Sequence, residues 1–536
     1  MPVQPTYPGV YIEEIPSGVR TITGVATSIT AFIGRALKGP VDDPFTITSF
    51  GDYERTFGGL WIDSTMSYAI QDFYLNGGSE AIIVRLFRKD ADDGVASISL
   101  PTSDSPLELF AASPGEWGNN LLASVDYETD DPTSNPASPP APDPDIFNVV
   151  IFQKNGDVTS KVEEYLNVSL KEDDTRFLPR LLEQRSNFVK IEKNPDGSWD
   201  IPLSRPGETA VDGEGRPIPV SATGGNDGLK LTDTEYNGNP GEKSGIYALR
   251  KADLFNLLCI PPPVRGENTS ADVYSKAVQL CVEERAMLIV DPPIEWGSTI
   301  AGAVQDPIDN LGSLLITGPN ARNAAIYYPL IQKTDPLRAN QLDTFVPSGA
   351  IAGIMAKTDT DRGVWKAPAG NDAALTGVRG LQVNLTDLEN GRLNKIGINC
   401  LRSFPLTGRI VWGARTMRGA DQHGDEYKYV PVRRTALYIE ESLYRGTQWV
   451  VFEPNDEPLW AQIRLNVGAF MHNLFRKGAF QGSTPKEAYL VKCDKETTTQ
   501  NDIDLGTVNI LVGFAPLKPA EFVIIKIQQL TGQIES

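Results

Sequence analysis

Short apolar runs alternate with helix-like segments in two stretches of this chain, and this alternation limits the fold more than any other feature. AIIVRLF (81–87) and AMLIVD (286–291) have the composition of buried strands, and a helix is predicted at Asp272–Glu284, just before the second of them. Strands that alternate with helices indicate a mostly parallel sheet with helices on its faces. We therefore predict an α/β core formed by residues 21–90 and 246–362.

The segment between these two stretches has a different composition. Residues 90–245 contain 29 acidic and 12 basic residues, a net charge of −17 out of −20 for the whole chain. The run TDDPTSNPASPPAPDPD (129–145) is too rich in proline and acid to form a core element. The flanking runs FNVVIF and KVEEYLNVSL indicate strands. We predict that residues 91–245 are an inserted, β-rich, acidic domain at the periphery, whose charge disfavours binding of nucleic acid.

Residues 363–520 are predicted to form an α+β C-terminal domain. Within it, the run 458–480 places apolar residues three and four positions apart, which predicts a helix packed on a core. No acidic residue lies between Glu457 and Glu487. The polar face of this helix is therefore expected to be basic, and it carries Arg464, Arg476 and Lys477.

Both ends of the chain are predicted to be extended. Residues 1–20 contain a short strand, Val10–Ile15, which is bracketed by prolines and has no hairpin partner nearby. Residues 521–536 contain FVIIKIQQ (522–529), which has the nearly continuous apolar composition of a strand buried on both faces. We predict an N-terminal arm and a C-terminal strand or arm.

The residue types that catalysis or cofactor binding requires are scarce. The chain has two histidines, His423 and His472, and neither lies near a GxSxG serine motif. The nearest match to a phosphate-binding loop, GNPGEKS (238–244), has a repelling carboxylate at Glu242. The four widely spaced cysteines are expected to be buried thiols. We therefore predict no catalytic residue, no metal ligand and no cofactor, and expect that the protein is not an enzyme.

The N-terminal sequence predicts where the chain is made. MPVQPTYPGVYIEE has neither a basic start nor an apolar run, and no stretch of the chain approaches the ~18 apolar residues of a membrane span. We expect synthesis and assembly in the bacterial cytoplasm without a signal peptide and without membrane insertion. Release would then occur within a larger particle or through lysis.

Several blocks of sequence resemble, in order, those of contractile tail sheath proteins of phages and of contractile injection particles. The resemblance covers roughly residues 5–90 and 245–530 and does not include 91–245. The blocks are PGVYIEEIPSG, TSITAFIGRALKGP, FGDYERTFGG, YLNGGSEAIIVRLF, GIYALRKADLFNLLCIPP, ERAMLIVDPP, VPSGAIAGIMAKTDTDRGVWKAPAG, LNKIGINCLR, VWGARTM, KYVPVRR, QWVVFEPN, FRKGAFQG and FAPLKPAEFVIIKI.

This resemblance implies a subtilisin-like core and a structural subunit that polymerises around an inner tube and contracts. Its implied partners are other copies of itself in a six-fold helical sheath, the inner tube protein, and baseplate and tail-terminator or cap proteins. Terminal arms would add strands to the sheets of neighbours. The added strand would contain Val10, Tyr11, Ile12, Glu13 and Ile15. The C-terminal strand, with Phe522, Val523, Ile524, Ile525 and Ile527, is a candidate member of the receiving sheet. The basic helix face is a hypothetical tube contact, in a tube-proximal C-terminal domain.

Two other functions remain as alternatives. A subtilisin-fold hydrolase is disfavoured by the scarcity of histidine, and a non-contractile tube or shell protein is disfavoured by the arm and the sheath blocks. The sequence does not distinguish a phage tail from a cell-made injection particle. It also leaves open the target cell, the role of the insertion, and whether other sheath proteins co-assemble.

Overall fold

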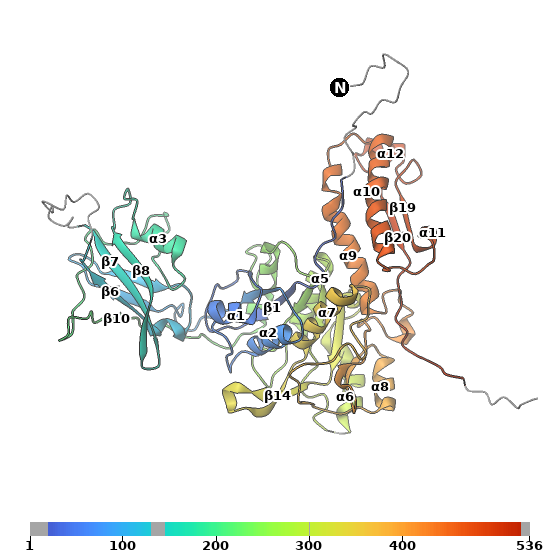
Figure 1. Cartoon of the computed structure of the whole chain (residues 1–536), viewed down its shortest axis with the longest axis horizontal. Coiled ribbons are helices and arrows are strands. Elements are labelled where there is room, and N and C mark those ends of the chain that lie inside the picture. Colours follow the sequence, from blue (N-terminus) through green and yellow to red (C-terminus); the bar gives the residue numbers. More distant parts are fainter. Residues whose placement is uncertain (1–19, 130–144, 300, 527–536) are drawn as a thin grey trace, which may run out of the picture.

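The structure, a computed structural model, describes residues 20–129, 145–299 and 301–526, which form three regions (Figure 1). A central body lies between a β-rich region, labelled β6 to β8 and α3, and a lobe that contains α9 and α10. The structure is mixed α/β, as the sequence predicts.

The body is organised around an eight-stranded sheet whose order is β18-β17-β13-β12-β11-β1-β3-β2. The six inner strands are parallel, and the two edge strands, β2 and β18, are antiparallel to their neighbours. Every residue of the central strands is buried, which explains their apolar composition. The strands are β1 (Thr30–Gly34), β2 (Phe45–Ile47), β3 (Ala81–Arg85), β11 (Leu257–Cys259), β12 (Met287–Val290), β13 (Ala324–Tyr328), β17 (Asn399–Phe404) and β18 (Gly408–Val411).

Helices cover both faces of this sheet and enclose two apolar cores. One core includes α5, close to the predicted helix, and the other includes α2 and α7. Two glycines let α7 approach α2 closely, because a Cβ at Gly349 would lie 2.0 Å from the Ala69 carbonyl oxygen and one at Gly353 would lie 2.4 Å from that of Phe73. The helices of the body are α1 (Phe50–Phe57), α2 (Thr65–Leu75), α4 (Asp233–Asn237), α5 (Ala271–Glu283), α6 (Gly302–Asn310), α7 (Ser348–Arg362) and α8 (Asp387–Asn394).

The region inserted between β3 and β11 has two antiparallel sheets and a core of its own, which runs from Ala96 to Ala222. Its predicted end at residue 245 is too late, because Leu231 and Tyr236 are buried in the core of the body. Its elements are β4 (Ser97–Leu100), β5 (Leu107–Ala111), β6 (Leu121–Asp126), β7 (Phe147–Asn155), β8 (Val158–Val168), α3 (Leu178–Arg185), β9 (Val189–Lys190) and β10 (Val220–Ser221).

The body also extends beyond residue 362, after which we predicted the C-terminal domain. β17 pairs in parallel with β13, so residues 399–411 complete the main sheet. Between β13 and β17 in the sequence, the chain also forms a smaller sheet of β14 (Ile331–Asp335), β15 (Gln341–Phe345) and β16 (Gly380–Leu381).

The C-terminal lobe consists of two long helices and a two-stranded antiparallel sheet. The amphipathic helix is confirmed as α10, whose Leu459, Ile463 and Val467 are buried. It begins where the Asp456 carboxylate accepts a hydrogen bond from the Leu459 amide. The elements are α9 (Val430–Gly446), α10 (Glu457–Arg476), α11 (Pro485–Ala488), β19 (Tyr489–Lys492), α12 (Gln500–Asp504) and β20 (Leu511–Phe514).

Candidate functional site

The segment that follows β20, residues 515–526, is here called the C-terminal arm. It leaves the lobe without forming a helix or strand and runs past the body (Figure 1). Its apolar side chains face solvent: Phe522, Val523, Ile524 and Ile525 are between 73% and 83% exposed. The prediction of a buried strand here is therefore wrong for the single chain. No strand in the described ranges pairs with these residues, and the described part of the chain leaves them uncovered.

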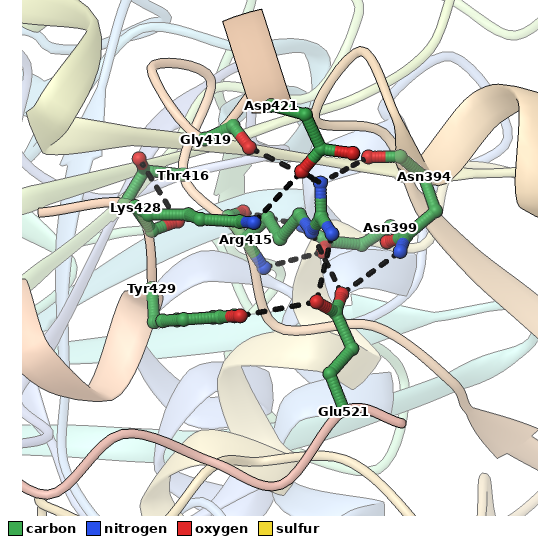
Figure 2. Close-up of polar contacts among 9 residues, drawn as sticks. All are labelled: Asn394, Asn399, Arg415, Thr416, Gly419, Asp421, Lys428, Tyr429 and Glu521. Carbon is green, nitrogen blue, oxygen red and sulfur yellow. Dashed lines mark hydrogen bonds and ion pairs between the residues drawn. The ribbon is translucent and has the colours of Figure 1, made fainter. Parts of the chain in front are cut away.

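A buried arginine holds the arm to the body just before the exposed run (Figure 2). Arg415 donates from Nε to Oε1 of Glu521 and from Nη2 to Oε2, both at 2.7 Å. The Arg415 side chain is 1% exposed and that of Glu521 is 19% exposed. Such a bidentate pair fixes orientation as well as distance. The arm is therefore attached to the body at one defined residue, Glu521.

Further groups complete the contacts of this ion pair. Asn394 donates to Oε1 of Glu521 at 2.8 Å, and the Tyr429 hydroxyl donates to Oε2 at 3.0 Å. The third guanidinium nitrogen, Nη1 of Arg415, donates to Asp421 at 2.9 Å and to the Asn394 carbonyl at 2.8 Å. We call these residues the Arg415 network. A buried charge pair is stable only when its remaining hydrogen-bonding positions are filled, and here they are.

The position of Arg415 itself is set by the main sheet. The Asn399 side chain in β17 accepts the Arg415 amide hydrogen at 2.7 Å and donates to the carbonyls of Arg415 at 2.7 Å and Ile326 at 3.1 Å. Ile326 lies in β13. One amide side chain thus ties the arginine backbone to two parallel strands.

The electrostatics of the Arg415 network favour the charged forms. Burial alone would raise the pKa of the Glu521 carboxyl, but the hydrogen bonds from Arg415 and Asn394 and the charge of Arg415 hold it below its ordinary value. Burial and the neighbouring Glu521 carboxylate raise the pKa of Tyr429 to about 12, so the tyrosine remains a hydrogen donor.

A groove of about 970 Å³ lies beside the Arg415 network, and we call it the arm groove. Its walls come from the ends of α7 and α10, from α8, from the chain after β18 and from the arm itself. The aromatic side chains of Trp365, Trp412 and Tyr429 line it together with Pro519. Trp412 is 41% exposed. The groove is therefore large and open to solvent, and it combines aromatic with charged side chains.

The sheet of β19 and β20 lies just before the arm in the chain. It has two strands, and in the described structure no third strand pairs with either outer edge. Leu490 and Leu511 are both about half exposed. An isolated two-stranded sheet is marginally stable, and unpaired edges are templates for a strand from another chain.

The three basic residues predicted on α10 differ in their surroundings. Arg464 is bound: it pairs with Glu457 at 2.6 Å and donates to the Cys493 carbonyl. Glu457 lies two helical turns before Arg464 and neutralises its charge, which was not predicted from the sequence. Arg476 and Lys477 are exposed at the end of the helix and form no ion pair with any residue that the structure describes.

The N-terminal strand residues Val10, Tyr11, Ile12, Glu13 and Ile15, and Ile527 at the other end, lie outside the described residues. The description begins at Arg20, whose amide donates to the Asn466 side chain at 3.0 Å and whose guanidinium lies 4.7 Å from the Trp449 ring centre. Ile22 is buried in the core of the lobe. The chain that leads from the N-terminal segment is therefore fastened to α10.

The described residues do not assemble a hydrolase triad. The Ser348 hydroxyl donates directly to the Asp291 carboxylate at 2.8 Å, with no imidazole between them. His423 and His472 are both exposed on other elements. Burial raises the pKa of Asp291 to about 7, against the opposing hydrogen bonds from Ser348. Within residues 20–129, 145–299 and 301–526, no group of three or more His, Cys, Asp or Glu side chains is placed to hold a metal ion.

The sequence analysis missed the Arg415 network. One signal was available: Glu521 is a lone acid directly before an apolar run. Its partner Arg415 lies 106 residues away, and nothing in the sequence around Arg415 indicates the pairing.

Among the described helices, none is long and apolar enough to cross a bilayer.

Comparison with known families gives two matches that together take in just over half of the chain. Residues 253–417 match the family model described as "Phage tail sheath protein central domain", and residues 422–529 match "Phage tail sheath C-terminal domain". The tail sheath protein of Burkholderia phage BcepMu is 24% identical over 485 residues, which are 88% of this chain and 87% of that protein. The tail sheath protein of Vibrio phage KVP40 is 27% identical over 186 residues, which are 34% of this chain and only 26% of that protein.

Solved structures share the fold along nearly the whole chain. The sheath of an extracellular contractile injection system in its contracted state covers 98% of this chain and 99% of its own, with 22% identity and a TM-score of 0.55. The sheath tail protein of Listeria innocua covers 93% of this chain and 96% of its own, with 13% identity and a TM-score of 0.58.

Proposed function

The chain belongs to the phage tail sheath family and is a structural subunit of a contractile sheath, and on that premise we propose that copies of it polymerise around an inner tube and contract to drive the tube through a target envelope. The observation that carries the proposal is the exposed apolar run of the C-terminal arm beside the bound Glu521. An apolar run that is held at a fixed point and that no described part of its own chain covers suits a neighbour's sheet.

We propose that β19 and β20 receive the exchanged strands. A strand of one copy, Val10–Ile15 or Phe522–Gln528, would add to an open edge of this sheet in a neighbour. Each backbone hydrogen bond contributes only about 1 kcal/mol net, but a polymer repeats the contact in every copy. This explains why a two-stranded sheet with exposed leucines is kept on the surface of the lobe.

Partners and setting follow from the same proposal. The subunit would contact other copies in a six-fold helical sheath, an inner tube, and baseplate and terminator proteins, as part of a phage tail or a phage-tail-like injection particle. It would be made in the bacterial cytoplasm and would need no cofactor and no catalysis. We also propose that the parallel sheet of the body is a subtilisin-like core without the catalytic triad. The direct Ser348–Asp291 contact supports this.

Deletion of residues 1–16 tests the strand exchange. We expect a subunit with unchanged thermal stability that forms no extended sheath, because the described cores of the body and the lobe consist of residues between Ile22 and Phe514. Negative-stain electron microscopy gives the readout, and a variant with Val10, Ile12 and Ile15 changed to serine is the matched control for loss of apolar contact alone. Intact sheaths from the deletion variant would contradict the proposal.

A second deletion tests the peripheral placement of the insertion. Its two connections meet where the Asn226 side chain donates to Asp92 at 2.6 Å, so residues 93–225 can be replaced by a short glycine linker. We expect polymerisation to persist, measured by sedimentation and microscopy, because Leu231 and Tyr236 stay in the body. The larger deletion of 91–245 is the control and should unfold the body. Loss of the lattice with the shorter deletion would show that the insertion is part of it.

A further inference from the structure

The arm groove has an aromatic lining that the exchanged strand does not explain. Trp365, Trp412 and Tyr429 line a cavity of about 970 Å³, and Pro519 of the arm lines it as well. Grooves lined by aromatic rings bind segments in the polyproline II conformation, because the proline rings pack against the aromatic faces. The groove therefore has the chemistry of a proline-binding site.

The chain contains a segment with matching spacing. Proline occurs at positions 2, 5 and 8, in the sequence PVQPTYP. A polyproline II helix has three residues per turn, so these three prolines would lie on one face of it. At 3.1 Å per residue, Pro2–Pro8 spans roughly 20 Å.

The groove is continuous with the sheet that is proposed to receive the exchanged strand. β20 ends at Phe514, and Leu517, three residues later, already lines the groove. A strand added antiparallel to β20 begins opposite Phe514. With Val10–Ile15 in that position, the residues before Val10 extend past Phe514 toward Leu517. The prolines would then enter the groove.

The groove carries charged side chains, whereas the proposed segment Pro2–Pro8 carries none. The groove is lined by four cationic side chains, Arg362, Lys366, Lys477 and Lys518, and by two carboxylates, Asp387 and Glu521. The charge of Glu521 is neutralised by Arg415. The only charged side chains in residues 1–19 are Glu13 and Glu14. In the register given above, Glu13 and Glu14 lie along β20 and not in the groove, and Pro2–Pro8 has no charged side chain. The contact in the groove therefore rests on apolar packing and not on charge.

From these observations we propose that the arm groove binds the segment Pro2–Pro8 of a second copy of the chain, in the polyproline II conformation. The inference rests on the proposed strand exchange and adds a contact beside it. The strand supplies backbone hydrogen bonds and the prolines supply apolar packing. The N-terminal segment of a neighbour would thus be held at two consecutive sites, the arm groove and the edge of β20.

Disulfide trapping in assembled sheaths tests the contact. The four native cysteines are buried, so the variant Thr6→Cys with Lys518→Cys adds one accessible pair. Under mild oxidation we expect a ladder of covalent multimers on a non-reducing gel. The matched control, Thr6→Cys with Asp309→Cys on α6, should give no ladder. A band that stays at monomer size but migrates as an internally linked chain would show that the segment binds in its own chain, and would overturn the inference.

A peptide experiment gives an answer even if the cysteine variant does not assemble. A fluorescent peptide of residues 1–9 is titrated into dilute full-length protein, and its anisotropy is measured. We expect saturable binding that Trp412→Ala weakens by about tenfold, since aromatic anchors are among the costliest residues to truncate in an interface. Phe452→Ala, at a fully exposed aromatic outside the groove, should leave the affinity unchanged.

The two proposals fail separately. Sheaths that form normally without a disulfide ladder, or a peptide whose binding is unaffected by Trp412→Ala, would overturn the groove contact and leave the strand exchange intact. Binding of a peptide of residues 527–536 to the groove in place of residues 1–9 would also overturn it. Loss of sheath on deletion of 1–16, together with groove binding of the peptide, supports both.

Discussion

Two segments of this chain have nearly the same composition and opposite surroundings. Ala81–Arg85, with sequence AIIVR, is β3, and its residues are buried between β1 and β2. The arm residues 522–526, with sequence FVIIK, are exposed to solvent. Burying an aliphatic side chain contributes about 1.5–3 kcal/mol, and β3 realises that gain within one chain. The exposed side chains of the arm have not gained this free energy of burial. It therefore remains available for assembly with a neighbour.

The largest effect is expected where the same charge is placed in each segment. Ile83→Asp puts a carboxylate into a fully buried strand and should unfold the subunit, since an unpaired buried charge costs several kcal/mol. Ile524→Asp, at a site 83% exposed, should change the free energy of unfolding by less than about 0.5 kcal/mol but abolish sheath formation. Chemical denaturation and electron microscopy give the two readouts. A stable Ile83→Asp subunit would break the comparison.

Loss of Arg415 should be the next largest effect. Arg415→Ala removes a buried guanidinium and leaves the Glu521 carboxylate without its cation, whereas Asp421 keeps Lys428. We expect a cost of about 3 kcal/mol of subunit stability in denaturant unfolding. Glu521→Gln is the matched control, and its cost should be smaller because Arg415 keeps Asp421. Equal costs for the two variants would show that the pair acts alone, without the rest of the network.

A pH dependence follows from the lowered pKa of Glu521. A carboxyl whose pKa is lower in the folded than in the unfolded state stabilises the fold above its unfolded value, here near 4.5, and loses that contribution as pH falls through its folded-state pKa. The difference in free energy of unfolding between the wild type and Glu521→Gln should therefore be constant near neutral pH and shrink below about pH 4.5. A difference that grows on acidification would contradict the assignment.

The smallest effect on stability is expected at the end of α10. Arg476→Ala with Lys477→Ala removes two exposed charges without ion-pair partners in the described structure, and should change the free energy of unfolding by less than about 0.5 kcal/mol. If these residues contact the tube, as predicted from the sequence, co-assembly with purified tube should decrease, whereas Lys486→Ala on α11 should not affect it. Arg464 is left out because it is already bound to Glu457. Normal tube-loaded sheaths would refute the contact.

The sequence was sufficient where the signal is local. Alternation of apolar strands with helices predicted the parallel sheet, and the spacing of Leu459, Ile463 and Val467 predicted α10. Boundaries were less accurate, because Leu231 and Tyr236 join the body only through contacts that are distant in sequence. The function was predicted from the family resemblance. The residue types of the chain served only to disfavour catalysis and cofactor binding.

The assembly site was harder to predict for a physical reason. An apolar run indicates that a segment is buried, but it does not indicate which chain covers it. The pairing of Glu521 with Arg415 depends on how β17 and the arm come together, and Asn399 contributes only through its side-chain amide. Such contacts are set by the tertiary structure and leave no periodic pattern in the sequence.

The Arg415 network also has a mechanical consequence. If a neighbour pulls on the arm, the force enters the body at Glu521, crosses the guanidinium of Arg415, and reaches β17 and β13 through Asn399. The load path therefore bypasses β19 and β20. Tension is carried into the parallel sheet, where the hydrogen bonds between β13, β17 and their neighbours share it.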